Sequence, residues 1–268
     1  MKQLIINSDD YGRAPEISRG IREAHLRGVV TSSTCMMNIP TTADDIRIAL
    51  QEAPNLAMGV HLVLTMGKPI LPREKVPSLV DENGYNRKYT PFLENIPNLN
   101  MDEVKAEWRT QIEAYVQASG KQPSHLDSHH HAAYFSPALF RTLLELAKEY
   151  NCPIRYPLLP TNADTHEFGE TTRHAPDLLK EFNPRRPDVF FVNFYDENAT
   201  KEILLNIINN VSDGISELMC HPGYVDADFA KESIYNLQRE KELKILTDPA
   251  IKDAIQAQDI QLITFADL

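Results

Sequence analysis

The sequence lacks any apolar run long enough to cross a membrane. A membrane-spanning helix needs about 18 or more consecutive apolar residues, whereas the first apolar run, Leu4-Ile5-Ile6, continues directly into the polar Asn7-Ser8-Asp9-Asp10. These polar residues also interrupt the apolar segment that a secretory signal peptide requires. We therefore expect no membrane partner, no signal peptide and a cytoplasmic protein.

Cysteine and positive charge are both scarce. The three cysteines, Cys35, Cys152 and Cys220, have no CxxC spacing and cannot all pair, which is typical of a reducing compartment. Lys and Arg number 27 against 38 Asp and Glu, giving a net charge of -11. Nucleic acids and anionic membranes attract basic patches, so neither is an expected partner. The composition favours a small-molecule partner instead.

Short apolar runs rich in Val and Ile alternate with longer stretches of helical periodicity, which is typical of βα units around a parallel sheet. The predicted strands are Gln3–Asn7, Val30–Met37, Ala57–Leu64, His125–Asp127, Pro153–Arg155, Val189–Asn193, Ser216–Cys220 and Gln261–Phe265. The predicted helices are Glu16–Gly28, Ala43–Gln51, Asp102–Ser119, Pro137–Tyr150, Thr200–Asn209 and Phe229–Leu246. We expect one α/β domain over residues 1–268, a closed or nearly closed barrel of seven or eight strands.

Two segments, 65–100 and 157–187, break this alternation. Each contains five prolines. Long loops inside a compact domain are uncommon and usually functional, so we expect both to be insertions that cover a substrate. Plain solvated loops are the alternative.

Two carboxylates and a histidine follow or interrupt apolar strands. Asp9 and Asp10 come directly after the first strand, and His61 lies within the otherwise apolar Gly59–Leu64. Active sites of β/α barrels lie at the carboxyl ends of the strands, where one carboxylate can bind a metal while the other takes a proton. An ordinary turn or helix cap, and a core histidine, are the alternatives.

The densest local signal is His125-Leu126-Asp127-Ser128-His129-His130-His131, with four imidazoles and one carboxylate in seven residues. Strand periodicity places His125, Asp127 and approximately His129 on one side. Imidazole is the commonest metal ligand, and a nearby carboxylate can orient it. The alternative is a solvated polar loop.

Two further charged groups stand at strand ends. His221 ends an apolar strand and precedes Pro222-Gly223, and the proline holds it extended. Arg155 ends another strand, where it can orient a carboxylate or hold an anionic group of a substrate. A turn histidine and a surface arginine are the alternatives. Asp, His and His from three strand ends would give a metal three ligands and an open position, and the remaining carboxylate and imidazole would act as base and acid.

These motifs resemble those of the YdjC-like carbohydrate deacetylases, and more closely those of the chitooligosaccharide deacetylase branch. The matching segments are Asn7–Gly12, Gly28–Thr34, Gly59–Pro69, Pro123–His131 and Glu217–Pro222. The resemblance implies a distorted barrel of the polysaccharide-deacetylase (NodB-like) type, a homodimer and one divalent metal ion, Mg²⁺. It also implies hydrolysis of the N-acetyl group of N-acetylglucosamine oligosaccharides such as chitobiose or chitotriose, 6-phosphorylated after uptake, in chitin degradation.

Carried over residue by residue, the resemblance implies a role for each motif residue. The metal ligands are Asp10, His61 and His125, the base is Asp9, and the acid is His221. From their positions in the predicted strands, and not from the resemblance, we expect substrate-binding or supporting roles for Asp127, His129 and Arg155. Two imidazoles with one carboxylate suit Zn²⁺ or Co²⁺ better than Mg²⁺, which prefers oxygen ligands. A metal-dependent phosphoesterase, a glycosidase and a non-catalytic sugar-binding protein are the alternative functions.

Overall fold

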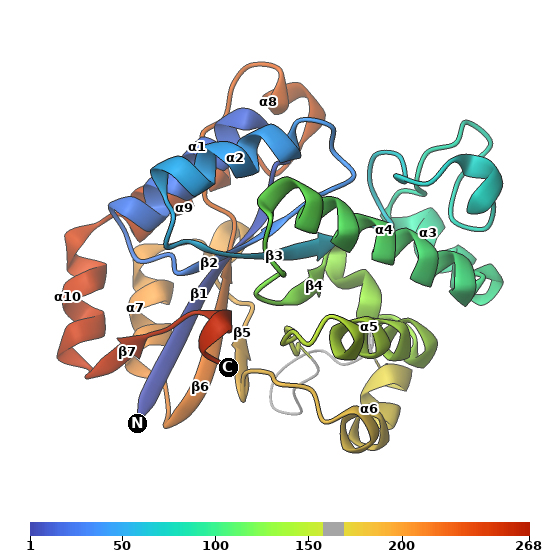
Figure 1. Ribbon diagram of the computed structural model, residues 1–268. Helices are drawn as coiled ribbons and strands as arrows, with labels where there is room; N and C mark the ends of the chain where they lie inside the picture. The colour runs from blue at the N-terminus through green and yellow to red at the C-terminus, as the bar shows by residue number, and fades with distance from the viewer. Residues whose placement is uncertain (158–168) are drawn as a thin grey trace.

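The computed structural model describes residues 1–157 and 169–268 (Figure 1). Its described strands form one parallel sheet in the order β4-β3-β2-β1-β6-β5, with β7 also paired to β1. The strands are β1 Lys2–Tyr11, β2 Ser32–Cys35, β3 Ala57–Leu62, β4 Leu126–Ser128, β5 Val189–Phe191, β6 Gly214–Cys220 and β7 Ile260–Leu262. The parallel α/β architecture predicted from the sequence is confirmed.

Strand β1 is central because it pairs along both edges. On one edge β6 runs beside Lys2–Ser8. On the other edge β7 pairs with Lys2–Leu4, and β2 pairs with β1 from Asn7 onward. The carboxyl half of β1 therefore lies between β2 and β6, deep inside the molecule.

Helices form an outer layer around the curled sheet (Figure 1). They are α1 Pro15–Leu26, α2 Thr42–Glu52, α3 Tyr89–Asn95, α4 Met101–Ser119, α5 Pro137–Glu149, α6 Gly169–Phe182, α7 Lys201–Asn209, α8 Phe229–Glu232, α9 Leu237–Leu246 and α10 Pro249–Ala257. Neighbours touch in the order α6, α5, α4, α2, α1, α9. Short 3-10 segments are Arg73–Lys75, Ile96–Asn98, His129–Tyr134, Asp196–Asn198 and Phe265–Asp267. No helix among the described residues has the length and apolar character of a membrane span.

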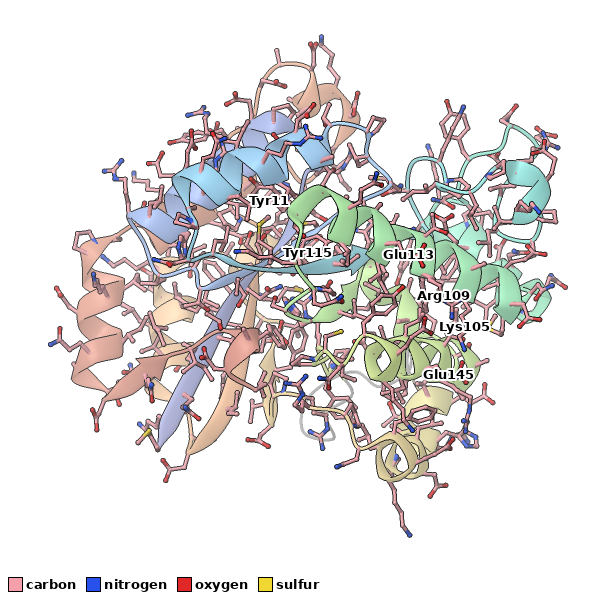
Figure 2. The ribbon with its side chains drawn as sticks, in the orientation of Figure 1. Tyr11, Lys105, Arg109, Glu113, Tyr115 and Glu145 are labelled. Atoms are coloured by element: carbon pink, nitrogen blue, oxygen red, sulfur yellow. The ribbon has the colours of Figure 1, made fainter. Side chains whose placement is uncertain are left out.

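Helices α4 and α5 are joined by ion pairs as well as by packing. Lys105 Nζ lies 2.6 Å from Glu145 Oε2 (Figure 2). Arg109 donates two bonds to Glu149, at 2.9 and 2.8 Å. These pairs are partly exposed, so each contributes only about 0–1 kcal/mol. Trp108 on the same helix is fully buried, and this burial stabilises the contact more strongly.

The segment 65–100 is ordered and attached to α4. The fully buried Glu107 carboxylate accepts the backbone N–H groups of Ile70 and Leu71, both at 2.9 Å. Ser78 N–H donates to Glu103 at 2.8 Å. Helix α3 lies within this segment and was not expected from the sequence.

The interpretation of 157–187 as a loop is wrong for its second half, because Gly169–Phe182 forms α6. Residues 158–168 lie outside the described part of the chain. Pro176 lies inside α6, where a proline removes one backbone hydrogen bond, but Ala175 and Leu178 are buried where α6 packs on α5. Packing of an apolar face thus outweighs the local signal of proline.

Two helices near the carboxyl terminus also differ from the prediction. The single helix expected over Phe229–Leu246 is two, α8 and α9, and Asn236 caps the second by accepting the N–H of Leu237. Helix α10 is an addition to the predicted elements. It begins at Pro249, and the side chain of Asp248 caps it by accepting a backbone N–H at 2.9 Å.

The strand expected over Pro153–Arg155 is reduced to one parallel bridge between Ile154 and Leu126. Leu126 N–H donates to the Pro153 carbonyl at 2.9 Å, and Arg155 N–H donates to the Leu126 carbonyl at 3.1 Å. These two bonds place Arg155 beside the first residue of β4.

Candidate metal and acid–base site

The site begins at an irregularity near the end of β1. The β1–β2 register shifts between Ser8 and Tyr11, and Asp10 has φ +69° in the left-handed region. Consecutive side chains of a regular strand point to opposite faces, but a bulge re-aims them and is common beside active sites. Asp9 and Asp10 are each only 3% exposed, and both contact groups of the same buried cluster.

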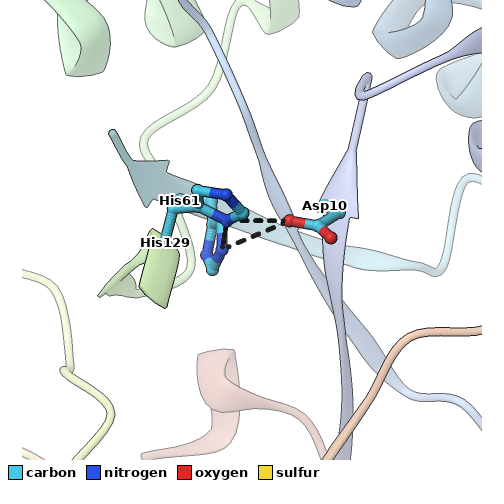
Figure 3. Close-up of side chains that lie close together, drawn as sticks. All are labelled: Asp10, His61 and His129. Atoms are coloured by element: carbon cyan, nitrogen blue, oxygen red, sulfur yellow. Dashed lines mark hydrogen bonds and ion pairs between the residues drawn. The ribbon is translucent and has the colours of Figure 1, made fainter. Parts of the chain in front are cut away.

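Asp10, His61 and His129 form the centre of this cluster (Figure 3). Asp10 Oδ1 lies 3.5 Å from His61 Nε2 and 3.1 Å from His129 Nδ1, and these nitrogens are 3.3 Å apart. The residues come from β1, β3 and the 3-10 segment after β4. Three potential ligand atoms from distant parts of the chain therefore meet at one point.

The ring of His61 is held in one orientation through Nδ1, the nitrogen that does not face Asp10. Its Nδ1 lies 2.7 Å from Asp127 Oδ1, and the hydroxyl of Thr34 donates to Asp127 Oδ2 at 3.1 Å. Burial disfavours the imidazolium, but the carboxylates of Asp127 and Asp9 outweigh it and raise the pKa of His61 to about 9. A carboxylate that receives the other ring N–H is the usual support of a metal-binding histidine. Nε2 is thereby left to face Asp10.

The donor set fits a divalent metal. Asp10 Oδ1 is buried and makes no hydrogen bond within the described structure, although two ring nitrogens stand within 3.5 Å of it. Ligand atoms about 2.0–2.1 Å from a tetrahedral metal ion are roughly 3.3–3.4 Å apart. The observed separations of 3.1, 3.3 and 3.5 Å match this spacing.

His125 does not lie in this group. Among the described residues, two groups of potential metal ligands lie close together, Asp10 with His61 and His129, and Asp9 with His61 and Asp127, and neither contains His125. Its ring stacks on Phe265 with centroids 3.6 Å apart, and its Nδ1 lies 2.9 Å from the Ser124 hydroxyl. Gly59 permits this packing, because a Cβ there would approach the His125 carbonyl oxygen to 2.5 Å. The structure thus brings His129, rather than the expected His125, to Asp10 and His61.

The reason is local. Strand β4 ends at Ser128 and a 3-10 segment begins at His129, so strand periodicity no longer governs the direction of that ring. His130 and His131 follow with φ +54° and +56°. The His130 ring stacks on His129 at 3.9 Å. Burial lowers the pKa of both His130 and His131 to about 3, so they are neutral.

Arg155 orients carboxylates. It is fully buried and donates two bonds to Asp9, at 2.7 and 2.6 Å, and one to Glu217, at 2.8 Å. Its Nη1 also lies 3.0 Å from Asp127 Oδ2. Of the two roles that the sequence left open, the structure fits the orienting one, because every guanidinium nitrogen already faces a carboxylate.

The two carboxylates bonded to Arg155 differ in protonation. Burial opposes ionisation of Asp9, but Arg155 outweighs it and holds the pKa of Asp9 well below its usual range. At Glu217 burial dominates over Arg155 and raises the pKa to about 8. Asp9 is therefore ionised at neutral pH. Glu217 was not expected from the motifs, although a Glu inside the apolar run of β6 is a visible signal.

His221 lies at the end of β6 beside Asp9. Its Nε2 is 3.9 Å from Asp9 Oδ2, and its backbone N–H donates to Glu242 of α9. Burial lowers the pKa of His221 to about 4, against the opposing effect of Asp9. The rings of Tyr195 and Tyr235 stand edge-on to it, at 5.4 and 5.6 Å.

Arg239 completes the site and is absent from the sequence predictions. It projects from α9, and its Nη2 donates to Asp10 Oδ2. This leaves only the other oxygen of Asp10 facing the two imidazoles. The sequence of α9, Leu237–Leu246, is rich in charged residues and reads as a solvated helix, so no local signal distinguishes Arg239.

Comparison with known proteins finds one matching family model and several similar relatives. A family model described as YdjC-like protein matches residues 3–257. A carbohydrate deacetylase of Enterococcus faecalis is 38% identical over 272 residues, covering 100% of this chain and 98% of the relative. A chitooligosaccharide deacetylase of Yersinia enterocolitica is 33% identical over 269 residues, covering 99% of each.

Solved structures agree with this grouping. One from Enterococcus faecalis V583, designated a candidate cellobiose-phosphate cleavage protein, matches with a TM-score of 0.88 at 38% identity, over 99% of this chain and 98% of that one. The Xyl-CE4 domain of a xylanase from the Trinervitermes trinervoides hindgut metagenome matches with a TM-score of 0.53 at 8% identity, over 99% of this chain and 88% of that one. The latter likeness concerns the fold alone. It confirms the distorted barrel of the polysaccharide-deacetylase type, here a curled half-barrel.

Proposed function

This chain belongs to the YdjC-like family, and on that premise we propose that it is a metal-dependent carbohydrate deacetylase. The proposed substrates are N-acetylglucosamine oligosaccharides such as chitobiose and chitotriose, and the products are acetate and the free amino sugar. The observation that carries the proposal is the buried Asp10 Oδ1, which makes no hydrogen bond and faces two imidazole nitrogens. Asp9 and His221 lie beside these three residues and supply a carboxylate and an imidazole that are not among the proposed metal ligands.

Asp10, His61 and His129 would hold the metal. When bound, a divalent ion supplies a Lewis acid that polarises the acetamide carbonyl and lowers the pKa of water. Two nitrogens and one oxygen favour Zn²⁺ or Co²⁺ over Mg²⁺. Arg239 and Asp127 fix the directions of Asp10 and His61 respectively.

Asp9 and His221 would move the protons. Ionised and clamped by Arg155, Asp9 accepts a proton from the attacking water as its oxygen bonds to the acetyl carbon. Asp9 is a weak base, so it releases this proton readily. At neutral pH His221 is uncharged, because burial lowers its pKa to about 4, so it first takes up the proton that Asp9 releases across the 3.9 Å between them. It then delivers that proton to the amide nitrogen as the C–N bond breaks, because an amine anion is a very poor leaving group.

The alternative functions fit the geometry less well. A glycosidase needs a protonated carboxylic acid beside a second carboxylate, but arginines hold both Asp9 and Asp10 ionised. Glu217 has a raised pKa, but it is fully buried against Arg155. A non-catalytic sugar-binding protein has no need of Asp9 and His221 beside its metal.

Several finer features belong to the proposal through family resemblance. They are a 6-phosphate on the substrate, a place in chitin degradation and a homodimer. A cytoplasmic location, expected from the sequence itself, belongs to the proposal as well. Light scattering on the purified protein tests the dimer. Comparing the rates on diacetylchitobiose and on its 6-phosphate tests the requirement for phosphate.

The direct test is product analysis with metal-loaded protein. Diacetylchitobiose and its 6-phosphate are each incubated with the protein, and released acetate, inorganic phosphate and new reducing ends are measured. We expect acetate alone, lost in a His61→Ala, His129→Ala double variant and kept in a His25→Ala control, a histidine on α1. Phosphate or reducing ends without acetate would instead support a phosphoesterase or a glycosidase.

A further inference from the structure

Two tyrosine rings form a stacked pair next to His221. The rings of Tyr195 and Tyr235 are parallel within 2° and their centroids are 4.6 Å apart. Each also stands edge-on to the imidazole of His221. Both tyrosine rings therefore contact His221, the residue that we assign as the acid, with ring centroids 5.4 and 5.6 Å from its own.

Tyr195 is much more exposed than Tyr235. Tyr235 is only 9% exposed, whereas Tyr195 is 43% exposed. A ring has two faces, and Tyr235 covers one face of Tyr195 by stacking. Tyr235 therefore leaves the other face of Tyr195 uncovered. Burial and the nearby carboxylates of Asp10 and Asp196 raise the pKa of the Tyr195 phenol.

The stacked pair is firmly supported. The Tyr235 hydroxyl donates to Glu242, the same carboxylate that accepts the backbone N–H of His221. It also accepts the backbone N–H of Asp196 at 3.2 Å, and Asp196 in turn accepts the side chain of Gln238 at 3.1 Å. The platform and the acid thus share one buried carboxylate, so their relative positions are preorganised.

We propose that the free face of Tyr195 is the platform on which the pyranose ring that carries the scissile acetamide packs. This inference rests on the proposed deacetylase function. The C–H groups of an equatorially substituted sugar give it an apolar face, and a flat, half-exposed aromatic ring provides a matching surface at low conformational cost. A sugar ring seated there brings its amide nitrogen beside His221, so Tyr195 selects pyranose substrates rather than acyclic acetamides.

The test compares Tyr195→Ala and Tyr195→Phe in the zinc-loaded protein. Steady-state rates are measured on diacetylchitobiose. Calorimetry measures the Kd of an analogue in which non-hydrolysable methylsulfonamides replace both acetamides. For Tyr195→Ala we expect KM and the Kd of the analogue to rise about tenfold with kcat little changed, as for loss of one aromatic contact. Tyr195→Phe keeps the ring and should retain wild-type KM. Tyr150→Ala, at the far end of α5, is the matched control.

Other results would overturn the platform. A fall in kcat with unchanged KM and Kd would make Tyr195 a support of His221, and unchanged constants would give it no role. A change in mass by light scattering without a change in Kd would make its face a contact between copies of the chain. If Tyr195→Ala does not fold, Tyr195→Leu, which keeps apolar bulk without a ring, gives the same test. If the wild type releases no acetate, the proposed function fails, but calorimetry still decides the platform.

Discussion

Two segments of β1, Leu4–Ile6 in its amino half and Asn7–Asp10 in its carboxyl half, are both buried but differ in polarity and in regularity. In the amino half, Leu4, Ile5 and Ile6 are fully buried in regular register with β6. In the carboxyl half, Asn7 to Asp10 are also 0–3% exposed, but they are polar and the register with β2 is broken. Burying apolar groups stabilises the fold, whereas burying carboxylates costs free energy unless they are paired. The amino half therefore stabilises the sheet, and the carboxyl half depends on partners supplied by other elements.

The largest expected effect on stability comes from replacing Arg155, the partner that the three buried carboxylates share. Arg155→Met leaves Asp9, Asp127 and Glu217 buried around an uncharged side chain. We expect a loss of about 3–5 kcal/mol in the free energy of unfolding, measured by urea denaturation, together with loss of acetate release. Arg109→Met, which breaks only the partly exposed pair with Glu149, should cost about 1 kcal/mol or less. Equal costs for the two substitutions would contradict the distinction.

A substitution in the amino half should affect stability without affecting the site. Ile5→Ala removes a fully buried side chain, and we expect a loss of about 2–5 kcal/mol in the free energy of unfolding. Because Ile5 carries no part of the cluster, the zinc affinity of the folded protein should stay unchanged. Calorimetric titration with Zn²⁺ at a temperature where the variant is folded checks this. A weakened affinity would show that the two halves are coupled.

Substitutions of the two histidines that flank β4 should differ in their effect on zinc affinity. His129→Ala removes a proposed ligand, and we expect zinc binding to weaken by at least about 10–100-fold, the range seen for loss of supporting residues alone. His125→Ala removes a ring that packs on Phe265, so the main effect should be on stability. Competition with a chromogenic chelator measures both affinities. The opposite ranking would restore His125 as the ligand.

A smaller effect is expected from pH. The pKa of His61 is raised to about 9, so below that pH a metal ion must displace a proton from it. Zinc affinity should therefore rise by up to about tenfold per pH unit between about pH 7 and 9, and this contribution should level off above about pH 9. Asp127→Asn removes the largest cause of the raised pKa and should move the levelling point to lower pH. An identical pH profile in that variant would refute the assignment to His61.

The sequence predicts those parts of the site that follow from strand ends. Asp9, Asp10, His61 and His221 are recognisable because each ends or interrupts an apolar run, and parallel strands gather their carboxyl ends in one place. The placement of His129, and not His125, beside Asp10 and His61 could not be predicted in this way, because it depends on where β4 gives way to a 3-10 segment. The bulge that turns Asp10 inward is likewise a backbone feature with no distinctive residue.

The remaining residues come from long-range packing. Arg239 and Glu242 lie on a helix whose composition reads as solvent-exposed, and only the docking of α9 against the end of β6 makes them part of the site. Tyr195 follows a three-residue strand and gains its position by stacking on Tyr235, which is distant in the sequence. Helix α6 was not predicted because Pro176, which disfavours a helix interior, lies within it. In each case tertiary contacts decide what local preference leaves open.

Zinc titration of the metal-free protein, followed by acetate release from diacetylchitobiose, tests the central claim most directly. If Asp10, His61 and His129 hold one ion, as proposed, activity should rise in proportion to added zinc and reach its plateau at one ion per chain. The His129→Ala variant should show no such plateau. Full activity before any metal is added, or a plateau preserved in His129→Ala, would contradict the account.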